Sequence, residues 1–137
     1  MPVPELLGRL HPLLVHLPIG ILLFAVGLMS YGRLKKVDVD AAVSLAWGLG
    51  ALSALLACGA GWLLAQSGEY DAAMVARHQW TGLATAGLAT ITFLLNRYRW
   101  PVALLTVGFL SVAGHFGGML THGDDYLFPG AKQMAGT

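Results

Sequence analysis

Four long stretches without a Lys, Arg, Asp or Glu dominate the sequence and limit the folds that the chain can adopt. They run approximately over residues 12–31, 41–65, 78–95 and 101–121. Each has about 18 to 25 residues, enough to span roughly 30 Å of hydrocarbon as an α-helix. Because the polar connectors are short, consecutive helices are expected to be antiparallel neighbours. The sequence therefore predicts an all-α, integral membrane four-helix bundle with up-down-up-down topology, formed by residues 1–137 as a single domain.

Composition agrees with a membrane protein and excludes several other classes. The chain is 56% hydrophobic and 11% charged, far from the mix of a soluble domain. A net charge of +1 with scattered basic residues excludes nucleic-acid binding. The single cysteine, Cys58, excludes a disulfide framework and covalent haem attachment. The first apolar stretch is too long for a signal-peptide core, so we expect it to be retained.

Basic residues near the helix ends predict the orientation in the membrane. Five belong to the first and third connectors, and three to the opposite side of the bundle: Arg33, Lys35, Lys36, Arg97 and Arg99 against Arg9, Arg77 and Lys132. This bias predicts that both termini lie outside the cytoplasm. The same outer side carries the acidic residues Glu69, Asp71, Asp124 and Asp125.

All five histidines fall at this outer end of the predicted bundle: His11, His16, His78, His115 and His122. At 1.5 Å per residue, His16 should lie roughly 7 Å deeper than His11, and His115 about 10 Å deeper than His122. Intramembrane imidazoles are costly unless they have a partner. Each could be satisfied by a helix–helix hydrogen bond or by the headgroup region. The depth of His16 and His115 instead favours a functional role for these two.

Haem ligation is the chemistry that best suits paired imidazoles on facing helices. The stretch GHFGG supplies a ligand, His115, together with space beside it from Gly114, Gly117 and Gly118. Arg9 and Arg77 lie within two residues of an outer histidine and could pair with haem propionates, or could act as interfacial anchors.

A metal ion bound directly by the histidines is the alternative site. His11, His78 and His122, with Asp124 or Asp125, would suit zinc, copper or iron. The sequence contains no His-Glu-x-x-His motif, and its spacing supports no Ser-His-Asp arrangement, so nothing indicates hydrolytic chemistry.

Several motifs resemble a known family of bacterial membrane proteins. LHPLLVHLPIG, GWLLA followed by GEYD, RHQWTG and GHFGGMLTHGDDYL are similar to the family called domain of unknown function 2231, and to the membrane portion of planctomycete-type cytochrome c proteins. The resemblance covers nearly the whole chain and implies a four-helix membrane domain associated with redox proteins. It matches the motif histidines to the five histidines here. It also implies the bacterial cytoplasmic membrane as the location.

The resulting hypothesis is a b-type cytochrome that transfers electrons through one or two non-covalently bound haems. His16 and His115 are the preferred axial pair, and a second pair would come from His11, His78 and His122. Such a protein is an electron carrier or subunit rather than a stand-alone enzyme. Expected partners are membrane lipid, a c-type cytochrome or other redox subunit, a quinone and a second copy of the chain. The competing hypothesis is a non-redox membrane anchor or assembly module, or a His-rich zinc or copper site.

Overall fold

The computed structural model describes residues 2–95 and 99–123, and these residues are helical with short connectors. In order, the helices are α1 (Val3–Arg9), α2 (His11–Leu14), α3 (His16–Lys35), α4 (Asp40–Ala65), α5 (Ala72–Leu94) and α6 (Arg99–His122). The described ranges contain no strand. The predicted all-α class is therefore confirmed for this part of the chain.

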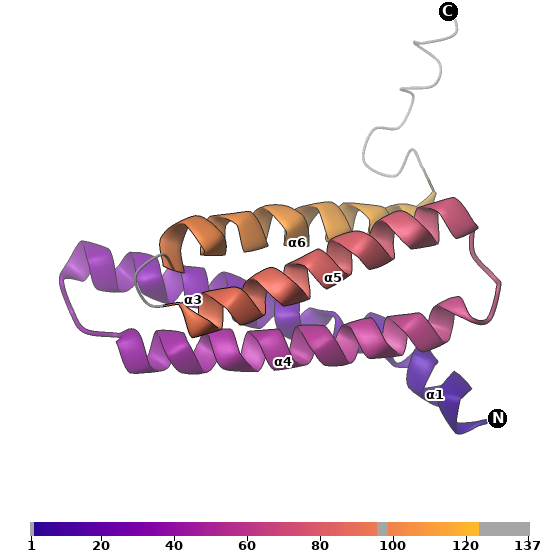
Figure 1. Ribbon diagram of the computed structural model, residues 1–137, viewed down its shortest axis with the longest axis horizontal. Coiled ribbons are helices and arrows are strands. Elements are labelled where there is room, and N and C mark those ends of the chain that lie inside the picture. Colours follow the sequence, from indigo (N-terminus) through magenta and orange to yellow (C-terminus); the bar gives the residue numbers. More distant parts are fainter. Residues whose placement is uncertain (1, 96–98, 124–137) are drawn as a thin grey trace, which may run out of the picture.

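The four long helices, α3 to α6, lie side by side along the long axis of the molecule (Figure 1). Helix α5 packs against both α4 and α6, and α3 packs against α4. Contacts between α3 and α6 are few. The described helices thus form a bundle in which α4 and α5 make the most extensive contacts with the other helices.

Three of the helical segments are long and apolar enough to cross a membrane: Val3–Lys35, α4 and α6. Helix α5 has the length, with 23 residues, but is less apolar because it carries His78, Gln79 and several threonines. The hydroxyls of these threonines are satisfied within the helix, since each donates to a carbonyl in the preceding turn: Thr81, Thr85, Thr90 and Thr92. Of the four predicted spans, three therefore have the length and apolarity that a span requires.

The N-terminal segment is broken twice, and the second break, at Val15, falls inside the helix that the sequence predicted over 12–31. Breaks at Leu10 and Val15 separate α1, α2 and α3. Pro12 lies within the first turn of α2, and Pro18 lacks the N–H that would bond to the carbonyl of Leu14. Figure 1 shows α1 turning away from the long axis of the bundle. As a result, His11 and His16 belong to different helices.

Small residues and one large aromatic fill the centre of the bundle. Trp47 on α4 is completely buried, and its Nε1–H donates to the Sδ atom of Met29 on α3 at 3.3 Å. Leu22 and Ala25 of α3 pack into the same cluster. Small side chains on α4 let the helix backbones approach closely, which is how helices associate in lipid.

Helix α5 begins at Ala72 rather than at His78, because an aspartate caps it. The Oδ1 atom of Asp71 accepts a hydrogen bond from the backbone N–H of Met74 at 2.8 Å. This is the usual N-cap geometry, which satisfies an otherwise unpaired donor in the first turn. The cap places His78 in the second turn of α5, inside the bundle, rather than at its first residue.

Candidate functional site

Two histidines from different parts of the chain meet inside the bundle. His11 begins α2 and His78 lies on α5, yet their ring centroids are 5.8 Å apart with an angle of 76° between the ring planes. Both side chains are partly buried. Because an imidazole can bind a metal through either ring nitrogen, this contact makes the two rings the central feature of the candidate site.

Each of the two rings is anchored by a hydrogen bond to the backbone of a neighbouring helix. The Nδ1 atom of His11 lies 2.8 Å from the carbonyl oxygen of Ala57 on α4, and that of His78 lies 2.9 Å from the carbonyl oxygen of Ala113 on α6. A carbonyl oxygen accepts and cannot donate, so Nδ1 carries the hydrogen in both rings. In the neutral ring the lone pair is then on Nε2 in both residues.

A glycine lies against each of the two rings, one helical turn after the carbonyl that anchors it. A Cβ atom at Gly61 would lie 2.8 Å from Cε1 of His11, and one at Gly117 would lie 3.1 Å from Cε1 of His78. The two rings therefore occupy equivalent settings. In each, an alanine carbonyl holds Nδ1–H, and a glycine four residues later leaves room for the imidazole.

The deeper pair favoured by the sequence, His16 and His115, has a different environment. Both side chains are exposed. His16 lies two residues before the buried Pro18, and His115 lies two residues after the buried Ala113, so each ring points away from the buried face of its helix. Within the described residues, no hydrogen bond or ring contact joins the two, and His115 has a ring contact with Phe116 beside it.

His122 is the last residue of α6 and its side chain is exposed. Its Nδ1 atom is 2.7 Å from Oγ1 of Thr121 and 3.3 Å from the carbonyl oxygen of Gly118. Gly114, predicted to leave space for a cofactor, has nothing within 4 Å of the position that a Cβ atom would occupy. Gly117 therefore makes the close approach to a histidine, whereas Gly114 faces open space.

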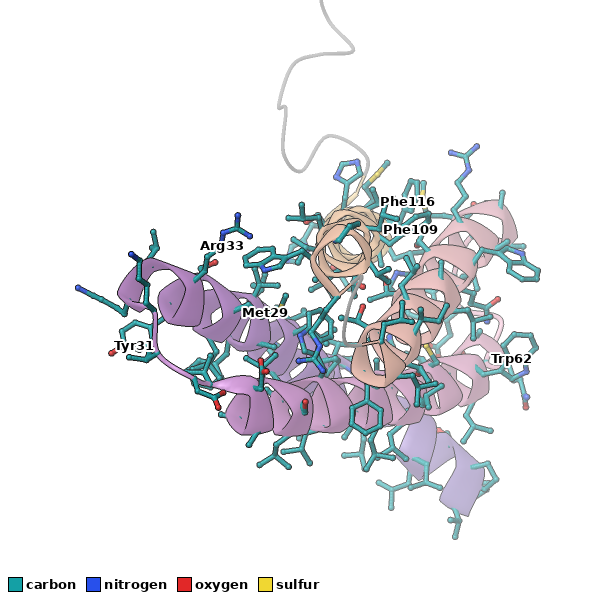
Figure 2. All side chains as sticks on the ribbon, turned by 60° about the vertical axis from the view of Figure 1, so that its left-hand side comes forward. Met29, Tyr31, Arg33, Trp62, Phe109 and Phe116 are labelled. Atoms are coloured by element: carbon teal, nitrogen blue, oxygen red, sulfur yellow. The ribbon has the colours of Figure 1, made fainter. Side chains whose placement is uncertain are left out.

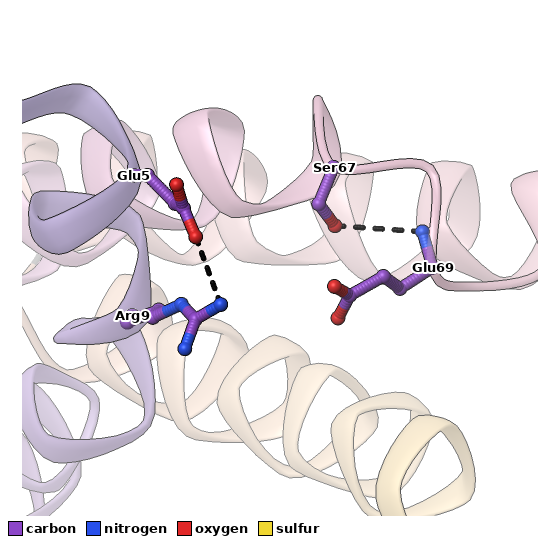
Figure 3. Close-up of polar contacts among 4 residues, drawn as sticks. All are labelled: Glu5, Arg9, Ser67 and Glu69. Carbon is purple, nitrogen blue, oxygen red and sulfur yellow. Dashed lines mark hydrogen bonds and ion pairs between the residues drawn. The ribbon is translucent and has the colours of Figure 1, made fainter. Parts of the chain in front are cut away.

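The two arginines predicted to bind propionates are both exposed. Arg9 forms an ion pair with Glu5 one turn away, at 2.8 Å (Figure 3). Arg77 immediately precedes His78 and makes no ion pair with a described residue. Asp124, Asp125 and Lys132, together with Arg97, lie outside the described residues.

The donor set of the site is two imidazoles. Across residues 2–95 and 99–123, no three His, Cys, Asp or Glu side chains converge on one point. A structural zinc site normally needs four protein ligands, whereas a haem iron needs the protein for its axial positions alone. With a metal–nitrogen distance of about 2 Å and about 1 Å more to the ring centre, two imidazoles on one ion have centroids roughly 5 to 6 Å apart. The observed centroid separation of 5.8 Å lies within this range of distances.

Sequence reasoning found the histidines but missed three partners of the pair: Ala57 and Gly61 on α4, and Ala113 on α6. The first two belong to the small residues of α4, which the sequence presents as a stripe suited to helix packing. The spacing of an alanine followed four residues later by a glycine recurs at Ala113 and Gly117 on α6, but it also occurs at Ala46 and Gly50, where leucine packs instead, so the spacing alone does not identify the pair. Comparison with models of protein families, with curated proteins and with solved structures gave no match.

Proposed function

We propose that this chain is a small membrane cytochrome of the b type, in which His11 and His78 hold the iron of one non-covalently bound haem. The observation that supports this proposal is the pair of anchored rings: centroids 5.8 Å apart, each Nδ1–H bonded to a backbone carbonyl. Histidines that bind metals almost always donate their second nitrogen in this way, because the bond fixes the ring and its tautomer.

The residues around the pair would hold and orient the ligands. The carbonyls of Ala57 and Ala113 keep Nε2 unprotonated and point each ring in one direction. Gly61 and Gly117 leave the space that the rings occupy. Arg77, exposed next to His78, is available to a propionate. The haem supplies the one-electron chemistry, and the chain supplies position, exclusion of water and electrostatics.

The wider context belongs to the same proposal. The bundle would cross a bacterial cytoplasmic membrane in up-down-up-down order with both termini outside, as the basic residues of the connectors favour. The histidine end would then face a c-type cytochrome or other redox subunit, with a quinone as a further candidate partner. His16 and His115, exposed on α3 and α6, are the alternative axial pair and the candidates for a second haem or a contact with a second copy of the chain.

One observation favours a second candidate function, a non-redox membrane anchor. The hydrogen bonds of His11 and His78 connect α2 to α4 and α5 to α6. Buried polar contacts of this kind stabilise helix association in lipid by themselves. On this alternative the histidines hold the bundle together and bind no cofactor.

An absorption spectrum of protein purified from haem-replete cells separates the two candidates. The proposal predicts a Soret band, split α and β bands on reduction, and about one haem per chain by the pyridine haemochrome method. Colourless protein that folds and contains no haem would favour the anchor. Colourless protein with stoichiometric zinc or copper would favour a metal site.

A further inference from the structure

An open cavity of about 430 Å³, lined by polar and apolar side chains in similar proportion, lies at the end of the bundle opposite to the histidine pair. Its wall is formed by the last turns of α3, the connector to α4, and the first turns of α4 and α6. In Figure 1 this is the left-hand end, where α3 and α4 are joined. Its volume lies within the usual range for small-ligand sites.

Two arginines supply positive charge to the cavity wall. Arg99, at the start of α6, is 7% exposed; its Nε donates to the carbonyl oxygen of Leu95 and its Nη2 to Oγ of Ser44, both at 3.1 Å. These bonds hold the guanidinium in place. Arg33, in the last turn of α3, is exposed at the rim, and Figure 2 shows it pointing outward while Met29 points in between the helices.

Two carboxylates supply an equal negative charge. Asp38 and Asp40 line the same cavity and are exposed. The Oδ1 atom of Asp38 accepts a hydrogen bond from the backbone N–H of Asp40 at 2.9 Å, which fixes the carboxylate at the start of α4. The wall is completed by apolar side chains, among them Val43, and by Trp100.

We propose that this cavity binds a zwitterionic phospholipid headgroup, with the phosphate against the arginines and the ammonium against the aspartates. The two charges of each sign match a ligand that carries both, whereas a purely anionic headgroup would meet both carboxylates. A primary ammonium offers three N–H donors to the aspartates, and a quaternary ammonium offers none. The ligand is therefore of the phosphatidylethanolamine class rather than the phosphatidylcholine class.

The position of the cavity agrees with a lipid ligand. It lies where three helices begin or end, next to Trp100, and indole side chains favour the membrane–water interface. Basic pockets between membrane helices bind the phosphate groups of anionic lipid headgroups at this level, and here the two aspartates would add a place for an ammonium group. The inference requires membrane insertion but does not depend on haem, so a colourless protein would leave it standing.

The test is lipid retention by the full chain, measured by native mass spectrometry after purification from mixed bilayers of known composition. Wild type should retain phosphatidylethanolamine in preference to phosphatidylglycerol and phosphatidylcholine. Arg33→Gln should weaken retention about fivefold, the loss of one hydrogen bond from the guanidinium to the phosphate. Lys35→Gln is the matched control, because Lys35 is equally exposed in the same helical turn but does not line the cavity; it should bind as wild type.

A second variant tests the ammonium half of the proposal. Asp38→Asn keeps a side-chain oxygen for the N–H of Asp40 and removes one negative charge, so the fold is retained and the preference should move toward phosphatidylglycerol. Equal retention of the three lipids, or equal loss in Arg33→Gln and Lys35→Gln, would overturn the proposal. Displacement of the lipid by soluble glycerophosphoethanolamine at micromolar concentration would also overturn it, since the ligand would then be a soluble phosphate ester.

Discussion

His11 on α2 and His78 on α5 belong to helices that do not follow one another in the chain, yet their ring centroids lie 5.8 Å apart with 76° between the ring planes. Each ring is fixed by its own hydrogen bond to a backbone carbonyl of another helix, α4 for His11 and α6 for His78. Because each ring has its own hydrogen bond, both rings are held in one orientation before any ligand binds. A ligand that is held before a metal arrives loses less conformational freedom on binding, so in the proposed haem site the two anchored rings would hold the iron in one geometry.

The close approach of glycine to each ring gives the first prediction. Gly61→Ala should displace the ring of His11, since its Cβ would lie 2.8 Å from Cε1, and should lower stability by about 1 to 3 kcal/mol. Gly117→Ala should have a smaller effect, because the corresponding distance is 3.1 Å. Thermal unfolding in detergent and haem content after purification are the measurements.

Gly59→Ala and Gly114→Ala are the controls for these two variants. They lie on the same helices, and nothing lies within 4 Å of the Cβ position at either residue. Alanine is the better helix former by roughly 1 kcal/mol, so both controls should be neutral or stabilising. Equal losses in all four variants would contradict the role assigned to Gly61 and Gly117.

The buried Trp47 leads to a prediction about packing. Trp47→Ala should destabilise the bundle by about 3 to 5 kcal/mol, because the side chain is fully buried and its N–H bonds to Met29. Trp62 on the same helix is 55% exposed, so Trp62→Ala should cost far less. Denaturation of the two variants in the same detergent makes the comparison, and similar midpoints would mean that the indole of Trp47 is not packed as described.

The acidic connector before α5 allows two roles of an aspartate to be separated. Asp71→Ala should lower stability by about 1 kcal/mol through loss of the cap on Met74 N–H, whereas Asp71→Asn should largely retain it. In Glu69, the backbone N–H bonds to Ser67 (Figure 3), so Glu69→Ala leaves this contact intact and should be neutral.

Two of these variants would affect electron transfer if the connector between α4 and α5 binds a basic redox partner. Asp71→Asn and Glu69→Ala would then slow electron transfer to that partner by similar amounts at low salt, with unchanged thermal stability. Stopped-flow rates at two ionic strengths distinguish this outcome from a purely structural role.

The ends of a helix could be predicted from the sequence where charged or polar residues border its apolar stretch. Helix α4, Asp40–Ala65, begins within one residue of the predicted range because charged or polar residues bound the apolar stretch on both sides. The start of α5 was missed, because the apolar pattern gives no weight to Asp71 as a cap. The breaks at Leu10 and Val15 depend on how the prolines and the neighbouring helix α4 combine, which periodicity does not report.

The sequence grouped His11 and His78 at a similar depth near the outer end, but it favoured the deeper His16 and His115 as the site, and it did not predict that His11 and His78 meet. Depth follows from position along a helix, at 1.5 Å per residue. The direction in which a side chain points turns by about 100° per residue around the helix axis. A break such as that at Val15 interrupts this rotation, so it changes the direction of His11 relative to His16. That His78 faces His11 also requires side chains of the first and third predicted helices to meet across the bundle, which the antiparallel packing of consecutive helices does not specify.

Ligand replacement tests the central claim most directly. In haem-loaded protein, His11→Gly and His78→Gly should each convert a low-spin iron spectrum to a high-spin one, and added imidazole should restore the low-spin spectrum by filling the vacated position. His16→Gly and His115→Gly, read in the same way, should keep the wild-type spectrum. Unchanged low-spin spectra in His11→Gly and His78→Gly, with loss in the other two variants, would contradict the account and assign the iron to the exposed pair.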